Sequence, residues 1–99
     1  MTIAMTHIAL HVRDFEACVG FYMDFCGLRI THERDDGAGG RVVWLAEPGR
    51  EREFIFVLLP GGPGRDQQEG DYSHFGFACE SREAVDAIAA RAEEAGCLM

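Results

Sequence analysis

A short pattern occurs twice in this chain, at residues 6–14 and again at residues 73–81. Each copy begins with a hydroxyl residue and a histidine, and continues with large apolar residues that alternate with small ones. The histidines are His7 and His74, and the copies end at Asp14 and Ser81, which are residue types that cap helices. Because self-similarity of this kind is typical of a duplicated unit, we expect two related modules.

The alternation within each copy predicts a β-strand with two different faces, because successive side chains of a strand point to opposite sides. One face carries the histidine with small or polar residues: His7, Ala9 and His11, and in the second copy His74, Gly76 and Ala78. The other face carries apolar residues: Ile8, Leu10 and Val12, and in the second copy Phe75, Phe77 and Cys79. We expect the apolar faces to enter the core. A pseudo-twofold axis between the copies would point His7 and His74 into one shared cleft.

The composition of the 99 residues, 47 % of them apolar, indicates one small globular domain. No apolar run reaches the roughly 18 residues that span a bilayer, and the N-terminus lacks a signal-peptide pattern, so we expect no membrane partner and a cytoplasmic location. The formal charge of -8 repels phosphate backbones and predicts no nucleic-acid partner. Four cysteines lack CxxC spacing, and we interpret them as buried, reduced thiols.

The order of predicted elements divides the domain into two modules joined by a linker. Module one, residues 1–60, contains the first strand, a helix from Asp14 to Gly27, and three further strands over 28–33, 41–46 and 53–59. The linker, residues 61–71, is rich in proline, glycine and polar residues. Partial module two, residues 72–99, contains a strand from His74, a helix from Ser81 to Ala95, and the start of a strand over 97–99.

The second module therefore lacks the strands that would complete it. We expect either that the chain is truncated or trimmed, or that another polypeptide supplies the missing strands. An unpaired sheet edge and an uncovered apolar face both favour association.

The chain resembles the vicinal oxygen chelate superfamily, which includes glyoxalase I, bleomycin-resistance proteins, fosfomycin-resistance thiol transferases and extradiol dioxygenases. The resemblance is carried by residues 6–14, by the end of the helix over 20–28, and by residues 73–77, in the order expected of paired βαβββ modules. It implies an α+β fold in which two such modules form a cupped mixed sheet, the second module being incomplete here. This fold hosts isomerases, dioxygenases, transferases and metal-free binding proteins, so it leaves the function open.

In that superfamily a divalent metal lies inside the cup, and the resemblance places its two histidine ligands at His7 and His74. Neutral imidazole suits Fe, Mn, Ni or Zn, and two histidines with one carboxylate leave open positions for two adjacent substrate oxygens. The carboxylates are where this chain departs from the pattern. Strand 53–59 is apolar in its middle, where a glyoxalase-like enzyme has a glutamate, and Glu53 lies too early. The third metal ligand is expected beyond Met99, on the last strand of the second module.

Several further residues are candidates for contact with a substrate. His11 shares a strand face with His7, so it either contacts substrate or has a structural or solvent-facing role. Trp44 and Phe56 lie in central strands, where they either pack in the core or line an apolar substrate cavity. Polar contacts near the mouth of the cup could come from Arg41, Glu53 or Tyr72, and His32 is expected to be exposed.

Three functions follow from these features. The first is a metal-dependent enzyme that binds a small substrate through two oxygens, with dioxygenase-like or transferase-like chemistry favoured over glyoxalase isomerisation. The second is a metal-free binding or resistance protein that holds an apolar or aromatic ligand in the same cup. The third is an assembly module, and a homodimer is expected because the sheet is incomplete.

Overall fold

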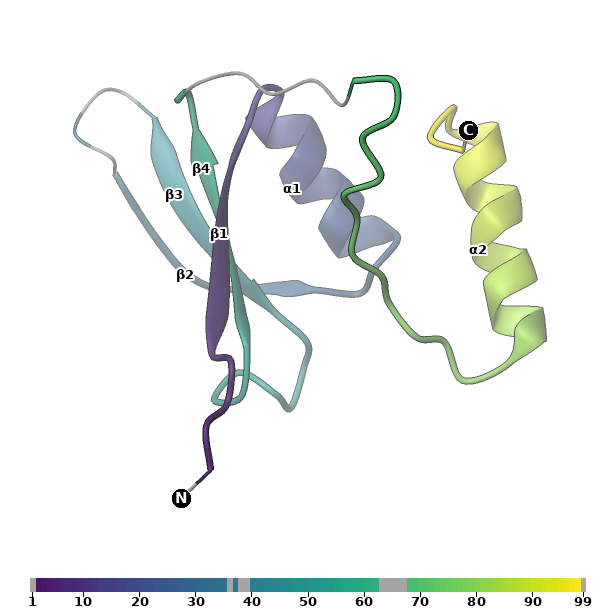
Figure 1. Ribbon diagram of the computed structural model, residues 1–99, viewed down its shortest axis with the longest axis horizontal. Coiled ribbons are helices and arrows are strands. Elements are labelled where there is room, and N and C mark those ends of the chain that lie inside the picture. The colour runs from purple at the N-terminus through teal and green to yellow at the C-terminus, as the bar shows by residue number, and fades with distance from the viewer. Residues whose placement is uncertain (1, 36, 38–39, 63–67, 99) are drawn as a thin grey trace. The chain divides into compact units, whose positions relative to one another are not determined.

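The computed structural model describes residues 2–35, 37, 40–62 and 68–98, and the chain divides into two compact units, Met1–Gln67 and Gln68–Met99. We describe each unit by itself. The first contains β1 (His7–Val12), α1 (Phe15–Asp24), β2 (Arg29–Asp35), β3 (Arg41–Ala46) and β4 (Ile55–Pro60), and the second contains α2 (Arg82–Glu94) (Figure 1). Part of the predicted linker, residues 63–67, lies outside the described residues.

The first unit confirms the predicted βαβββ order and has an α+β fold with a mixed sheet. Its strands lie in the order β1-β4-β3-β2, in which β1 pairs with β4 in parallel and the other neighbours are antiparallel. The parallel pair begins where the backbone N–H of Ile55 donates to the carbonyl of Thr6 at 2.8 Å. The first and last strands of the module are therefore neighbours, and β1 forms an edge of this four-stranded sheet.

Helix α1 lies against one face of this sheet (Figure 1) and forms the core with it. The core contains Val19 from α1, Leu28 from the segment between α1 and β2 and, from β3 and β4, Val43, Leu45, Phe56 and Leu58. On β1, Leu10 and Val12 pack against this cluster, whereas Ile8 at the start of the strand is 37 % exposed. The expected division of β1 into a core face and a histidine face is thus confirmed for the second half of the strand.

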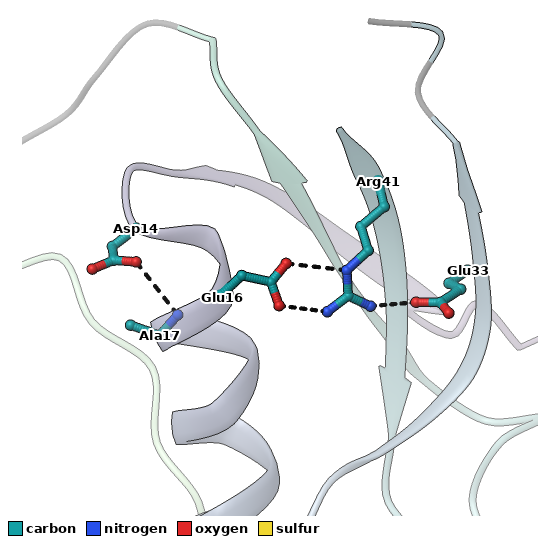
Figure 2. Close-up of polar contacts among 5 residues, drawn as sticks. All are labelled: Asp14, Glu16, Ala17, Glu33 and Arg41. Atoms are coloured by element: carbon teal, nitrogen blue, oxygen red, sulfur yellow. Dashed lines mark hydrogen bonds and ion pairs between the residues drawn. The ribbon is translucent and has the colours of Figure 1, made fainter. Parts of the chain in front are cut away.

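Both helices begin at the residues that the sequence predicts. Asp14 accepts a hydrogen bond from the backbone N–H of Ala17 at 3.4 Å (Figure 2), and Ser81 accepts one from Ala84 at 3.1 Å. Each of these bonds satisfies an N–H that the first helical turn leaves without a partner. Gly27, with φ of 71°, follows α1 and adopts a left-handed conformation that favours glycine.

The strand predicted from His74 is wrong: residues 73–79 form no strand in the structure. Phe75 and Phe77, which were expected to enter a core, are 48 % and 42 % exposed. A strand requires a neighbour that pairs with its backbone, and the described residues after α2 form no strand that could serve. Nor do residues 97 and 98 form the strand expected there, and Met99 lies outside the described residues.

The cysteines are all free, and only two are in or near the core. Cys18 and Cys26 are partly buried and pack against the core cluster, and burial raises the pKa of the Cys18 thiol. Cys79 and Cys97 are exposed, which corrects the expectation that all four are buried. Among the described residues, no helix has both the length and the apolar character needed to cross a bilayer.

Candidate functional site

The sheet face opposite α1 carries the histidine residues of β1 and defines the open face: His7, Ala9, His11, His32, Trp44, Ile55, Val57 and Leu59. The register arranges these residues in rows across the strands. His7 pairs with Ile55 in the first row, and His11 pairs with Leu59 in the last. The middle row runs from Ala9 through Val57 and Trp44 to His32. Two imidazoles therefore flank a small alanine on one edge strand, beside an apolar surface.

His7 lies at the first position of β1 and is exposed. Its Nδ1 lies 3.0 Å from the hydroxyl oxygen of Thr6. Because a hydroxyl can donate or accept, this contact is compatible with a proton on either ring nitrogen. In the tautomer with the proton on Nδ1, the hydroxyl accepts from that nitrogen and Nε2 has the lone pair that a metal or a substrate donor would use.

His11 lies at the other end of the same strand face, and its contacts define both the tautomer and the position of its ring. Its Nδ1 lies 3.2 Å from the backbone carbonyl oxygen of Pro60. A carbonyl only accepts, so Nδ1 carries the proton and Nε2 of the neutral ring is an acceptor. The ring also lies against Gly62, where an added Cβ would lie only 2.5 Å from the ring atom Cγ.

The two aromatic candidates lie on opposite faces of the sheet. Trp44 belongs to the open face and is 39 % exposed. The centroid of its indole lies 4.8 Å from that of the His32 imidazole. His32 is exposed, as expected. Phe56 is 6 % exposed and belongs to the core, with its ring 4.8 Å from that of Tyr22 on α1. Of the two roles that the sequence left open for Phe56, core packing is therefore the one that matches its position.

The second unit contains His74, the other predicted metal ligand. The carboxylate of Asp71 accepts a hydrogen bond from the backbone N–H of Ser73 at 2.9 Å, and hydrogen bonds from Ser73 lower the Asp71 pKa. The imidazole Nδ1 of His74 lies 2.7 Å from the carbonyl oxygen of Tyr72. This contact places the proton on Nδ1 and leaves the Nε2 lone pair free, which is the form of histidine that binds metals.

Each of the two imidazoles, His7 in the first unit and His74 in the second, is a donor type that suits a divalent metal. No cluster of three or more His, Cys, Asp or Glu side chains that could hold a metal occurs within the described ranges. On β4, the side chains of the open face are Ile55, Val57 and Leu59, so this strand adds no carboxylate there. Glu53 precedes β4 and pairs instead with Arg50 at 2.9 Å.

Arg41, a candidate for polar contact with substrate, has another role. Its guanidinium binds Glu16 on α1 and Glu33 on β2 (Figure 2), and it lies 5.4 Å from the centroid of the Phe15 ring. These partners fix the side chain between helix and sheet. Residue spacing does not predict this network, because its three charged residues belong to three different elements.

Residues 4–99 match the model of the family described as the Glyoxalase/Bleomycin resistance protein/Dioxygenase superfamily. The chain belongs to this superfamily. Among curated proteins, an uncharacterized protein of Pseudomonas aeruginosa is 57 % identical over 99 residues, covering 100 % of this chain and 70 % of its own length. The resemblance inferred from the repeated histidine strand is confirmed.

Solved structures share the fold of this superfamily member. A protein described as a possible glyoxalase from Bacillus cereus has a TM-score of 0.75 and 26 % identity, covering 96 % of this chain and 76 % of its own. A mutant of the fosfomycin resistance protein FosX from Listeria monocytogenes, complexed with Mn(II) and 1S,2S-dihydroxypropylphosphonic acid, has a TM-score of 0.77. It is 18 % identical, covers 97 % of this chain and 71 % of its own, and shows likeness of fold alone.

Proposed function

We propose that this superfamily member is a divalent-metal-dependent enzyme that binds a small substrate through two neighbouring oxygens. The observation that carries the proposal is the state of His74, whose Nδ1 lies 2.7 Å from the Tyr72 carbonyl and whose Nε2 is left with a free lone pair. His7, which is the equivalent residue of the first copy, is exposed on the open face with its own Nδ1 beside Thr6. The Mn(II) in the FosX complex supports metal use in proteins of this fold.

In this proposal His7 and His74 hold the metal, and imidazole ligands suit Fe, Mn, Ni or Zn. When bound, the metal acts as a Lewis acid toward the substrate oxygens. The apolar side chains of β4, together with Trp44, contact the carbon skeleton of the substrate and exclude water from it. Phe56 supports this surface from the core side of the sheet.

The open face favours dioxygenase-like or transferase-like chemistry over glyoxalase-like isomerisation. An isomerase of the glyoxalase type uses a carboxylate as a base, and the open-face positions of β4 are all apolar. A two-histidine, one-carboxylate set requires only one acidic ligand, which need not come from β4.

Metal content measured after dialysis against Mn²⁺ tests the two ligands. We expect His7→Ala and His74→Ala each to lower the bound Mn²⁺ at least about tenfold, since losing one of few ligands removes a large part of the affinity. His32→Ala is the matched control, because His32 is also exposed but pairs with Trp44. Unchanged metal content in both ligand variants would overturn the proposal.

A metal-free binding protein is the second candidate, and the apolar character of the open face favours it. Val57, Leu59 and the exposed Trp44 offer a surface suited to an aromatic ligand without any metal. Ligand binding that survives exhaustive chelation would support this function over the first.

We also propose that the protein forms a homodimer. The exposed rings of Phe75 and Phe77 and the exposed side chain of Val85 support this, because exposed apolar groups in one short segment favour association. Sedimentation velocity at increasing concentration tests it, and a monomer at all concentrations would contradict it.

A further inference from the structure

The position of His11 is fixed by two independent contacts that the proposed metal site does not require. Its Nδ1 donates to the carbonyl of Pro60 at 3.2 Å, and its ring lies so close to Gly62 that this position has no room for a Cβ. Gly62 has a φ of 73°, which places the turn after β4 in the left-handed region. The turn therefore sets both the tautomer and the orientation of the imidazole.

The fixed tautomer decides what His11 can recognise. With the proton of the neutral ring on Nδ1, Nε2 is a hydrogen-bond acceptor and cannot donate. A hydroxyl or amide N–H of a ligand matches this nitrogen, whereas a carbonyl oxygen does not. His11 therefore selects for a donor.

The location of His11 decides where that donor lies. His7 and His11 are four residues apart on one strand face, which separates their Cα atoms by about 13 Å. Between them lies Ala9, whose small side chain leaves the strand surface open, with Val57 and Trp44 beside it in the same row. A ligand held at the His7 end can lie along this row and reach His11 with its other end.

We propose that His11 is a specificity-determining residue that accepts a hydrogen bond from a donor at the end of the substrate remote from its two metal-binding oxygens. Gly62 and the Pro60 carbonyl are the groups that position it. The substrate class is thus an elongated, largely apolar molecule with two adjacent oxygens at one end and a hydroxyl or N–H at the other. This inference rests on the proposed function, because the oxygen-bearing end is assigned to the metal at His7.

Two probes that differ in a single donor test this assignment. The first is phenylcatechol, and the second is the same compound with an added hydroxyl at the far end of the phenyl ring, both titrated in the presence of Mn²⁺. Quenching of Trp44, the single tryptophan of the chain, reports binding at the open face. We expect the hydroxylated probe to bind about three- to tenfold more tightly to the unmodified protein, since one neutral hydrogen bond has this net value.

Substitutions at His11 should remove or retain that preference according to acceptor capacity. His11→Phe keeps a ring but lacks an acceptor, so the two probes should bind this variant with equal affinity. His11→Gln keeps an acceptor and should restore part of the preference.

The two glycines of the turn provide a matched pair. Gly61 and Gly62 have similar φ angles, 69° and 73°, but a Cβ on Gly61 meets nothing within 4 Å. Both alanine variants carry the same backbone strain, and only Gly62→Ala displaces the His11 ring. We expect Gly62→Ala to abolish the preference and Gly61→Ala to retain it. Long-range ¹H–¹⁵N spectra should show the Nδ1–H tautomer of His11 in the unmodified protein and in Gly61→Ala, and its loss in Gly62→Ala.

The outcomes separate this inference from the function on which it rests. Equal affinity of both probes for the unmodified protein, or a preference that persists in His11→Phe, would overturn the role of His11 and leave the metal site standing. No quenching of Trp44 by either probe would overturn both.

Discussion

Arg41 on β3 donates two hydrogen bonds to the carboxylate of Glu16 on α1, from Nε at 3.1 Å and from Nη2 at 2.7 Å (Figure 2). This paired geometry joins the first turn of the helix to the sheet that it covers. Arg41 also binds Glu33, so one guanidinium connects three elements of the module. The network lies on the helix side of the sheet, which leaves the histidines of β1 on the other side free for a ligand.

Arg41→Lys should lower the melting temperature by a few degrees, because a lysine ammonium cannot reproduce the paired hydrogen bonds. Differential scanning calorimetry measures the change. Arg50→Lys is the matched control, since the ion-pair partners of Arg50 among the described residues, Glu47 and Glu53, lie in its own turn. Equal shifts in the two variants would show that the network between helix and sheet adds nothing beyond a local ion pair.

Glu16→Gln should destabilise the protein at neutral pH but not in acid. The hydrogen bond from Arg41 lowers the pKa of the Glu16 carboxyl from its ordinary value of 4.5. Because the folded-state pKa is the lower one, the stabilisation is fully present above 4.5 and is lost as the pH falls through the folded-state value. Melting temperatures of both proteins between neutral and acidic pH measure this difference. In an Arg41→Ala background, the effect of Glu16→Gln on the melting temperature should no longer depend on pH. A pH dependence that persists in that background would contradict the assignment of the lowered Glu16 pKa to Arg41.

Phe56→Ala should lower the free energy of unfolding by about 3–5 kcal/mol, since it creates a cavity in the core beside Tyr22. Urea denaturation measures this loss. Trp44→Ala removes a larger side chain that is 39 % exposed on the open face, and its cost should be smaller. A greater loss for Trp44→Ala would reverse the faces assigned to these two aromatic residues.

Ala9→Leu should weaken binding of phenylcatechol about tenfold, because the larger side chain occupies the surface between His7 and His11. Fluorescence of Trp44 measures the affinity, and Mn²⁺ content should stay unchanged because neither proposed ligand is altered. Ala17→Leu introduces the same side chain at an exposed position of α1 and should have no effect. Normal binding to the Ala9 variant would exclude the open face as the ligand surface.

Much of the secondary structure could be predicted from local sequence. The helix starts at Asp14 and Ser81 depend on side chains that bond to backbone a few residues away, so the residue types are sufficient to locate them. The bounds of β3 are those predicted, while β2 and β4 begin one or two residues later than expected. The strand predicted from His74 is wrong because pairing requires a second strand, which a local pattern cannot supply.

The candidate site likewise combines features that the local sequence predicts with features that depend on packing. His7 and His11 could be placed on one strand face because alternation is a property of any strand. Sequence left the roles of Trp44 and Phe56 open, because two neighbouring strands can each turn either face toward a helix. Packing of α1 resolves this: Phe56 contacts Tyr22, and Trp44 is left on the opposite face.

Repeats, caps and alternation are local properties, so they were sufficient to identify the superfamily, the order of elements in the first module and the pair of candidate histidines. The parallel pairing of β1 with β4, the network of Arg41 and the contact of His11 with Gly62 appear only in the folded chain. Each of these joins residues that are distant in the chain. Their distances depend on how helix and strands pack, which local propensity does not specify.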